Sequence, residues 1–258
     1  MSHKHPTIAP DVARFEWLVE TLTGLAEGGQ EIALRDAEKA EPFLAATALL
    51  RLALSYAQAV RTLLRKGEAD GTPPLQRAIY ELWVEQRYLL QVGSARENAI
   101  RLETNALLEI LEFARARSNY FPPDSIGGAE RSLSDLERRF PEVVSAVRAQ
   151  RGARRLHWSG VSRSQMERAV MPNPDLYKML SWEAHAVLSP LRDRTIEIDD
   201  KSAHFRFEPR DTPIAEPEPI AYLVGGILFF IWNEWAEYFG GPKVEVPSEY
   251  QGEGSGSA

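Results

Sequence analysis

Apolar residues recur every three or four positions through most of this chain of 258 residues, and this spacing predicts a protein built mainly from α-helices. Gly and Pro end the periodic segments, as between residues 66 and 74. Ser94 with Glu97, and Ser162 with Gln165, match the pattern that caps a helix N-terminus. The expected helices span residues 11–27, 42–65, 75–92, 94–117, 129–150 (with a break before Pro141), 162–170, 175–188 and 218–239.

One short region has the alternating pattern of β-strands. Apolar and polar residues alternate in TIEID (195–199) and AHFRF (203–207), on either side of the turn-forming DKS. We therefore expect a mainly α, single-domain, multi-helix bundle with one small β-hairpin near the C-terminus. Residues 1–190 would form the helical bundle that carries a polar site. The hairpin, a proline-rich connector and an apolar final helix packed on the bundle would occupy 191–242, and 243–258 would be a disordered tail.

The final helix contains the longest apolar run, Ile220 to Trp232. A membrane-spanning helix needs about 20 apolar residues, so we expect this segment to be a buried core helix and the protein to have no membrane span. Gly225 and Gly226 weaken an isolated helix, which suggests that they pack closely against a neighbouring backbone. The same apolar helix is where we expect a homodimer to form.

Composition excludes several classes of protein. The formal net charge of −7 argues against a general binder of polyanions that relies on long-range attraction. The absence of cysteine rules out disulfides, a thiolate nucleophile and Cys-ligated zinc. Residues 1–17 lack the apolar core of a secretory signal. Together these observations favour a cytoplasmic location.

Standard catalytic motifs are missing as well. The sequence has no phosphate-binding loop, no dinucleotide fingerprint, no Gly-x-Ser-x-Gly and no His-Glu-x-x-His. Its histidines are scattered, and no helix carries two of them four residues apart. We therefore expect no metal and no cofactor.

Charged residues are dense on the helix expected at 75–92. Arg77, Glu81 and Glu85 follow one another at intervals of four residues, so they project from one side of that helix. Such a row is either a solvated face with ion pairs between successive turns or one wall of an interior cleft. The large aromatic residues Trp83 and Tyr88 on the same helix favour partial burial.

Two histidines lie beside tryptophans and serines. Ser181 and His185 are four residues apart, so a regular helix places the hydroxyl and the imidazole on one face. An imidazole exchanges protons near neutral pH, and a neighbouring serine is either a nucleophile or a hydrogen-bond partner. His157 adjoins Trp158 and has the same two interpretations, catalysis or packing.

Taken together, these residues resemble the pattern of an uncharacterised, mostly prokaryotic family of helical domains of unknown function. That pattern is Arg-x-x-x-Glu on a helix, then a His-Trp segment, then Tyr-x-x-x-Ser-x-x-x-His. It corresponds here to RAIYE (77–81), HWSG (157–160) and YKMLSWEAH (177–185), within residues 45–190. The resemblance implies that Arg77, Glu81, Ser181 and His185 converge on one site, and it assigns no activity. We expect catalytic groups at His185, Ser181 and His157, and ligand-binding groups at Arg77, Glu81, Trp158 and Tyr177.

The side chains of this expected site suit a phosphate-bearing ligand, RNA or nucleotide. Two imidazoles and an arginine can catalyse metal-independent transesterification of a ribose phosphate. Helical prokaryotic ribonucleases of the toxin and defence class look similar in outline, with an Arg shortly before a His, as Arg151 stands before His157. Residues 131–168 also carry nine arginines against four acids. The alternative is a non-catalytic scaffold or regulatory protein in which the same residues form a buried structural network.

Overall fold

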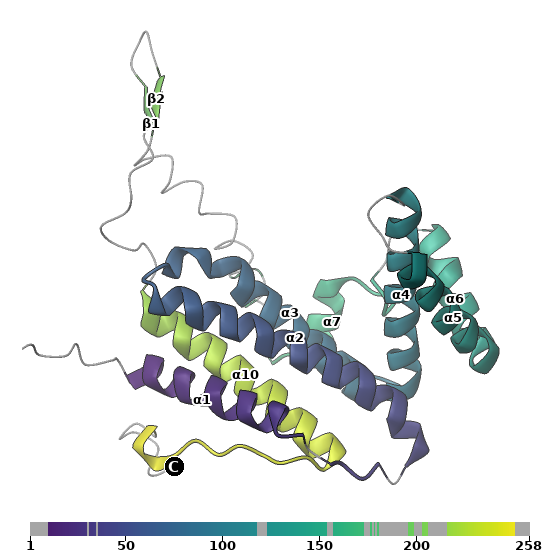
Figure 1. Ribbon diagram of the computed structural model, residues 1–258, viewed down its shortest axis with the longest axis horizontal. Helices are drawn as coiled ribbons and strands as arrows, with labels where there is room; N and C mark the ends of the chain where they lie inside the picture. Colours follow the sequence, from purple (N-terminus) through teal and green to yellow (C-terminus); the bar gives the residue numbers. More distant parts are fainter. Residues whose placement is uncertain are drawn as a thin grey trace, which may run out of the picture. The chain divides into compact units, whose positions relative to one another are not determined.

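A computed structural model describes residues 10–29, 31–34, 36–117, 123–153, 157–172 and 216–250, with residues 176, 178 and 180 and two short strands at 196–198 and 203–205. These ranges are mainly helical, as expected (Figure 1). The described helices are α1 (Pro10–Glu27), α2 (Ala40–Arg65), α3 (Pro73–Gln91), α4 (Ala95–Ala116), α5 (Pro123–Arg139), α6 (Pro141–Ala153), α7 (Arg163–Val170) and α10 (Pro217–Phe239).

Local sequence signals explain where several helices begin and end. The Ser94 hydroxyl accepts a hydrogen bond from the Glu97 backbone N–H at 3.2 Å and caps α4. Ser162 and Gln165 form a complete capping box at the start of α7. α5 and α6 are separate helices because Pro141 cannot continue the first one. α5 begins at Pro123, however, so the start expected for this helix at residue 129 is wrong.

The two strands are each three residues long. β1 (Ile196–Ile198) pairs antiparallel with β2 (Ala203–Phe205), and Glu197 lies opposite His204. The turn between them and the residues on either side lie outside the described ranges. The small β-hairpin therefore stays a prediction, as does the helix expected at 175–188, of which only residues 176, 178 and 180 are described.

The chain forms two compact units, each assembled from separate stretches of sequence. Unit 1 contains residues 1–31, 50–83 and 173–258, and unit 2 contains residues 32–49 and 84–172. Helices α2 and α3 each contribute one end to each unit. The sequence-based division at residue 190 stays a prediction.

In unit 1, α1 packs along α10 (Figure 1). Phe15, Leu18, Val19 and Leu22 of α1 are buried, and they recur at the helical spacing seen in the sequence. α10 buries ten residues, from Ile220 to Phe239, which confirms a core helix in this region. Two ion pairs between side chains of α1 and α2, Glu16 with Arg65 and Glu20 with Arg61, fasten these helices together.

The segment after α10 is tied back onto that helix. Gly240 adopts the left-handed conformation (φ 76°) that ends α10 and turns the chain. The Asn233 side chain then accepts a hydrogen bond from the Val244 N–H at 2.8 Å and donates one to the Val244 carbonyl at 3.0 Å. The Trp232 indole donates to the Pro242 carbonyl at 2.8 Å. Residues 242–244 are therefore bound to α10. The disordered tail expected over 243–258 stays a prediction.

Unit 2 has its own apolar core, where α5 and α6 pack on α4 (Figure 1). The buried residues of this core are Leu111, Ala129, Leu133, Leu136 and Val144. Glu41, at the start of α2, is 8% exposed and accepts hydrogen bonds from Arg96 at 3.1 Å and from Arg139 at 2.6 Å. Both guanidinium groups also lie over the Phe140 ring, at 5.2 and 4.9 Å from its centre. One buried carboxylate thus joins α2 to α4 and α5.

By length and composition alone, two segments are apolar enough to cross a membrane, Ala37–Arg65 and Pro217–Phe239. A core helix of a soluble protein passes the same criterion, and 56% of the apolar window in α10 is buried. The buried residues of α10 agree with a core helix. The cytoplasmic location and the homodimer stay predictions.

Candidate functional site

The structure describes four of the seven expected site residues. Arg77 and Glu81 lie on α3 within unit 1, whereas His157 and Trp158 belong to unit 2. Tyr177, Ser181 and His185 lie outside the residues whose side chains are described. The convergence of all seven on one site therefore stays a prediction.

Arg77 and Glu81 form an ion pair between successive turns of α3. The Arg77 Nε donates to the Glu81 Oε1 at 3.0 Å, and the two side chains are 27% and 23% exposed. The row that they begin is thus partly buried, which agrees with the expectation drawn from the neighbouring aromatic residues. The next member of the row, Glu85, has partners in unit 2 instead.

Glu85 is the centre of a cluster that joins α3 to residues 157–163. Its Oε1 lies 2.7 Å from Nη2 of Arg163 and 3.2 Å from Nε2 of His157. Nη2 of Arg163 is in turn 3.3 Å from Nε2 of His157. The side chains of Glu85, His157 and Arg163 are 13%, 19% and 26% exposed, so the cluster is largely buried but still reaches solvent.

The backbone around the cluster is held in place from both ends of α7. Residues 157–160 form a turn that is closed by a hydrogen bond from the Gly160 N–H to the His157 carbonyl at 2.8 Å. Gly160 has a φ of 78°, and a Cβ there would meet the Gln150 side chain at 3.0 Å, so a glycine is needed. The capping box at Ser162 then starts α7 with Arg163 as its first residue. At the other end, Arg87 donates to the Val170 carbonyl at 2.9 Å.

The His157 ring has a partner at each nitrogen. Nδ1 lies 3.3 Å from the Ser159 hydroxyl, and Nε2 faces Glu85 and Arg163. With a proton on Nε2 the ring donates to Glu85, and with a proton on Nδ1 it accepts from Arg163. A doubly protonated ring donates to both Ser159 and Glu85. Both tautomers of the ring therefore find hydrogen-bond partners in the same geometry.

Trp158 lies beneath the cluster and is only 3% exposed. Its ring meets Tyr88 edge-on, at 5.9 Å between centres and 81° between planes, and lies 5.4 Å from the His157 ring. Its Nε1–H is buried and has no hydrogen-bond acceptor among the described residues. In this arrangement Trp158 packs against the histidine from inside, and the ligand-binding role expected for it stays a prediction.

Sequence reasoning missed two members of this cluster, Glu85 and Arg163, as site residues. Glu85 was recognised only as part of the charged row, and Arg163 only as one of many arginines. They are separated from each other by 78 positions and pair through tertiary structure, so no short motif marks them. The one local signal was the capping box, which places Arg163 at a helix start.

Much of the arginine excess in residues 131–168 is neutralised by acids from other segments. Arg139 pairs with Glu41 and Arg163 with Glu85, both outside the segment, whereas Arg148 pairs with Glu137 inside it. Arg151, which the sequence suggested as a partner of His157, instead binds the side chain of Glu112 at 2.8 Å and that of Asn105 at 2.6 Å on α4. In the described part of the segment, the excess therefore does not amount to a row of unpaired arginines.

The cluster has the composition of an anion-binding and proton-transfer site. Glu85 and Arg163 compensate each other, so protonation of His157 gives the group a net positive charge. A guanidinium and an imidazolium side by side suit the oxygens of a phosphate. No group of three or more potential metal ligands occurs among the residues described.

Comparison with known proteins places the cluster within the part of the chain that matches a protein family. Residues 43–203 match the model of a family of unknown function, DUF5677. The match covers more than half of the chain and includes Glu85, His157 and Arg163. No curated protein and no solved structure matches the chain. The chain belongs to the family of unknown function DUF5677.

Proposed function

We propose that unit 2 binds a phosphate-bearing ligand, a nucleotide or RNA, at the Glu85–His157–Arg163 cluster. The observation that carries this proposal is the 3.3 Å distance between Nη2 of Arg163 and Nε2 of His157, with one carboxylate oxygen in contact with both side chains. A phosphate oxygen that approaches the exposed parts of these side chains meets a permanent cation and a proton donor together.

Within this proposal, a mononucleotide is favoured over long RNA. Binding of long RNA depends on many phosphate contacts along a basic surface. In unit 2 the described arginines Arg139, Arg148 and Arg151 form ion pairs with glutamates, and the whole chain has a net charge of −7. A single compact anion needs only the local charge of the cluster.

The chemistry that we propose for the site is proton transfer by His157 to or from an oxygen of the bound ligand. Glu85 positions the imidazole, and Arg163 compensates charge on the phosphate. Ribonuclease-like transesterification requires a second proton-transfer group. The catalytic roles expected from the sequence for His185 and Ser181 fall on residues outside the described ranges and stay predictions.

A second candidate function, a non-catalytic scaffold or regulatory protein, is favoured by the contacts of Glu41. There too a buried carboxylate holds two arginines, Arg96 and Arg139, and joins separate helices. Glu85 would then only fasten α3 to the start of α7. The two functions differ in one measurable respect, because only the first predicts that Arg163 contributes to ligand affinity.

The test compares two arginine variants of the same unit. AMP, ATP, inorganic phosphate and a short single-stranded RNA are titrated into the wild type, Arg163→Gln and Arg151→Gln by calorimetry at low salt. Arg151 is the matched control, because it also pairs with glutamates and is similarly buried but has no contact with His157. We expect nucleotide binding by the wild type and Arg151→Gln, and a loss of about tenfold or more in Arg163→Gln.

Equal affinities of the three proteins, or no binding of any probe, would favour the scaffold. The catalytic part has its own assay: cleavage of the RNA in the presence of a chelator, by wild type and by His157→Gln. Cleavage that is unchanged in His157→Gln would contradict the proposed proton transfer, whatever the binding results.

A further inference from the structure

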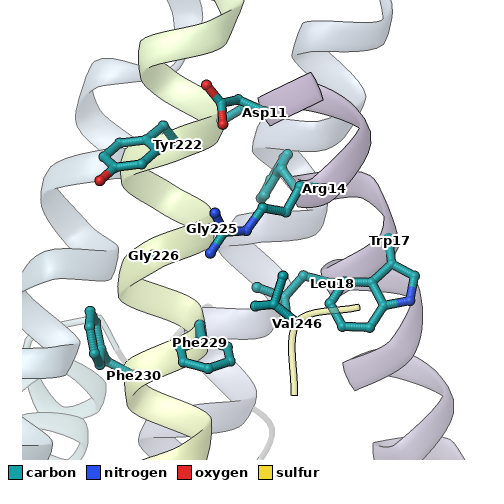
Figure 2. A pocket seen from close by; sticks show the side chains of 12 residues that line it. Asp11, Arg14, Trp17, Leu18, Tyr222, Gly225, Gly226, Phe229, Phe230 and Val246 are labelled. Atoms are coloured by element: carbon teal, nitrogen blue, oxygen red, sulfur yellow. The ribbon is translucent and has the colours of Figure 1, made fainter. Parts of the chain in front are cut away.

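Unit 1 contains a pocket between α1, α10 and the segment after α10 (Figure 2). Its volume is about 200 Å³, and it is partly open to solvent. The side chains of Arg14, Trp17 and Leu18 line it from α1, and Phe229 lines it from α10. All of its lining residues lie outside the region 43–203 that matches the family.

Two adjacent glycines of α10, Gly225 and Gly226, form part of the lining. A Cβ on Gly225 would lie 3.8 Å from the Phe15 Cα, so the close helix packing expected from the sequence is confirmed at this position. Gly226 is different, because among the described residues no heavy atom beyond its chain neighbours and the nearby backbone of its own helix lies within 4 Å of the place where its Cβ would be. The close packing against a neighbouring backbone that the sequence suggested is therefore wrong for Gly226. Gly226 therefore weakens the helix without allowing close approach of a neighbouring helix. Its missing side chain instead leaves space in the pocket.

The Arg14 side chain gives the pocket a positive charge. Figure 2 shows it reaching from α1 toward α10, with the guanidinium group beside Gly225. Arg14 is half-buried and has no ion pair among the described residues, whereas Arg61 and Arg65 of the same unit both pair with glutamates of α1. The guanidinium therefore offers its donors at the surface of a mainly apolar pocket.

The aromatic walls are held in place by further rings. Trp17 packs against Tyr250, at 5.9 Å between ring centres. Phe229 meets Phe230 edge-on at 5.9 Å, and Phe230 stacks on Trp83 with an angle of 7° between the planes. The third wall, at Val246, follows the segment that Asn233 fixes to α10. A pocket with fixed walls loses little conformational entropy when a ligand binds.

We propose that this pocket binds a small aromatic carboxylate. The carboxylate bonds to Arg14, and the ring extends one helical turn further, to the apolar surface formed by Leu18, Trp17 and Phe229. A cavity of about 150 Å³ is enough for benzene, so a pocket of this size suits one ring with a short acidic substituent. Asp11 also lines the pocket and disfavours a second negative charge, which makes a monoanion a better ligand than a phosphate dianion.

Three probes separate the contributions of ring and charge. Phenylacetate has both, phenylacetamide has the ring without the charge, and acetate has the charge without the ring. Their binding to the full chain is measured by ligand-observed NMR. We expect wild type to bind phenylacetate about tenfold or more tightly than either of the others, because only phenylacetate bonds to Arg14 and also fills the apolar part.

Variants locate the binding. Arg14→Gln is expected to remove the preference for phenylacetate over phenylacetamide, and Gly226→Leu, which fills the open space, to weaken both ring-containing probes. Arg51→Gln is the matched control, because Arg51 is an exposed arginine of the same unit and does not line the pocket. Thermal unfolding of each variant shows that it is folded, and Arg14→Lys serves as a second variant if Arg14→Gln is unstable.

The proposal is overturned by any of three results. The first is a wild type that binds phenylacetate no better than phenylacetamide, or not at all. The second is a preference that survives Arg14→Gln or is lost equally in Arg51→Gln, and the third is ring binding that Gly226→Leu leaves unchanged. None of these measurements depends on nucleotide binding by unit 2, so this inference and the proposed function stand or fail separately.

Discussion

Glu85 and Arg163 are joined by a 2.7 Å contact between Oε1 and Nη2, although 78 positions separate them in the chain. The contact fixes the start of α7 against α3, and the same carboxylate oxygen holds His157 at 3.2 Å. Arg77 and Glu81, about two turns and one turn earlier on α3, instead pair with each other. The charged row on α3 therefore makes two kinds of contact: an ion pair within the helix and a contact with a segment distant in the sequence.

From the contacts of Glu85 with Arg163 and His157, we predict that Glu85→Ala destabilises α7 more than the other helices. Removal of the carboxylate leaves a guanidinium and an imidazole that are only about a fifth to a quarter exposed. The loss of charged hydrogen bonds then costs about 2 kcal/mol. Hydrogen exchange should show faster exchange of the amides of Arg163–Val170, while those of the core of α4 and α5 change less.

Glu81→Ala is the matched control for Glu85→Ala on the same helix. Glu81 pairs with Arg77 one turn away, and that pair is more exposed, so its loss should cost about 0.5 kcal/mol or less. Equal destabilisation by the two variants, or unchanged exchange in α7, would contradict the role given to Glu85.

The buried carboxylate of Glu41 predicts a second large effect. Glu41→Ala leaves Arg96 and Arg139 without their shared partner, and their side chains, 35% and 46% exposed, can turn toward water. We therefore expect a loss of about 2 kcal/mol, below the cost of a fully buried pair. Urea unfolding measures it, with Glu97→Ala as the control. Glu97 pairs with Arg101 at the surface of α4 and should contribute under about 0.5 kcal/mol.

The helices were largely predictable from sequence because their signals are local. The helical spacing of Phe15, Leu18, Val19 and Leu22 corresponds to the buried face of α1, and the capping patterns at Ser94 and Ser162 lie at helix starts. The start of α5 was missed because the composition of residues 123–128 is typical of a loop. A proline is well tolerated in the first turn of a helix, as at Pro123.

The candidate site was less predictable because its partners are brought together by tertiary structure. His157 stood out beside Trp158, but Arg163 and Glu85 carry no local signal that selects them from the other charged residues. Arg151 had the more suggestive spacing and yet pairs with α4. Sequence spacing shows which residues share one face of a helix. A contact between distant segments depends on tertiary packing, which spacing does not reveal.

The ion pair between Glu16 and Arg65 predicts a dependence of stability on pH. The hydrogen bond from Arg65 lowers the pKa of Glu16 below its ordinary value of 4.5. The stabilisation is therefore complete above pH 4.5 and is lost as the pH falls through the lowered pKa. Arg65→Gln should be less stable than wild type at pH 7, by about 0.5 kcal/mol as for other exposed pairs. Urea unfolding at a series of pH values should show this difference shrinking in acid. A difference that is constant with pH would contradict the assignment.

Gly226→Ala should make the protein more stable, by up to about 1 kcal/mol, because alanine favours the helix and its methyl group meets no side chain among the described residues. Gly225→Ala, in contact with Phe15, gains the same helix preference but places its Cβ 3.6 Å from that ring, so a smaller gain is expected. Gly240→Ala should destabilise, because φ there is 76°. Thermal unfolding of the three variants tests this order. If Gly226→Ala were the most destabilising of the three, Gly226 would be packed after all, and the open space that the pocket requires would not exist.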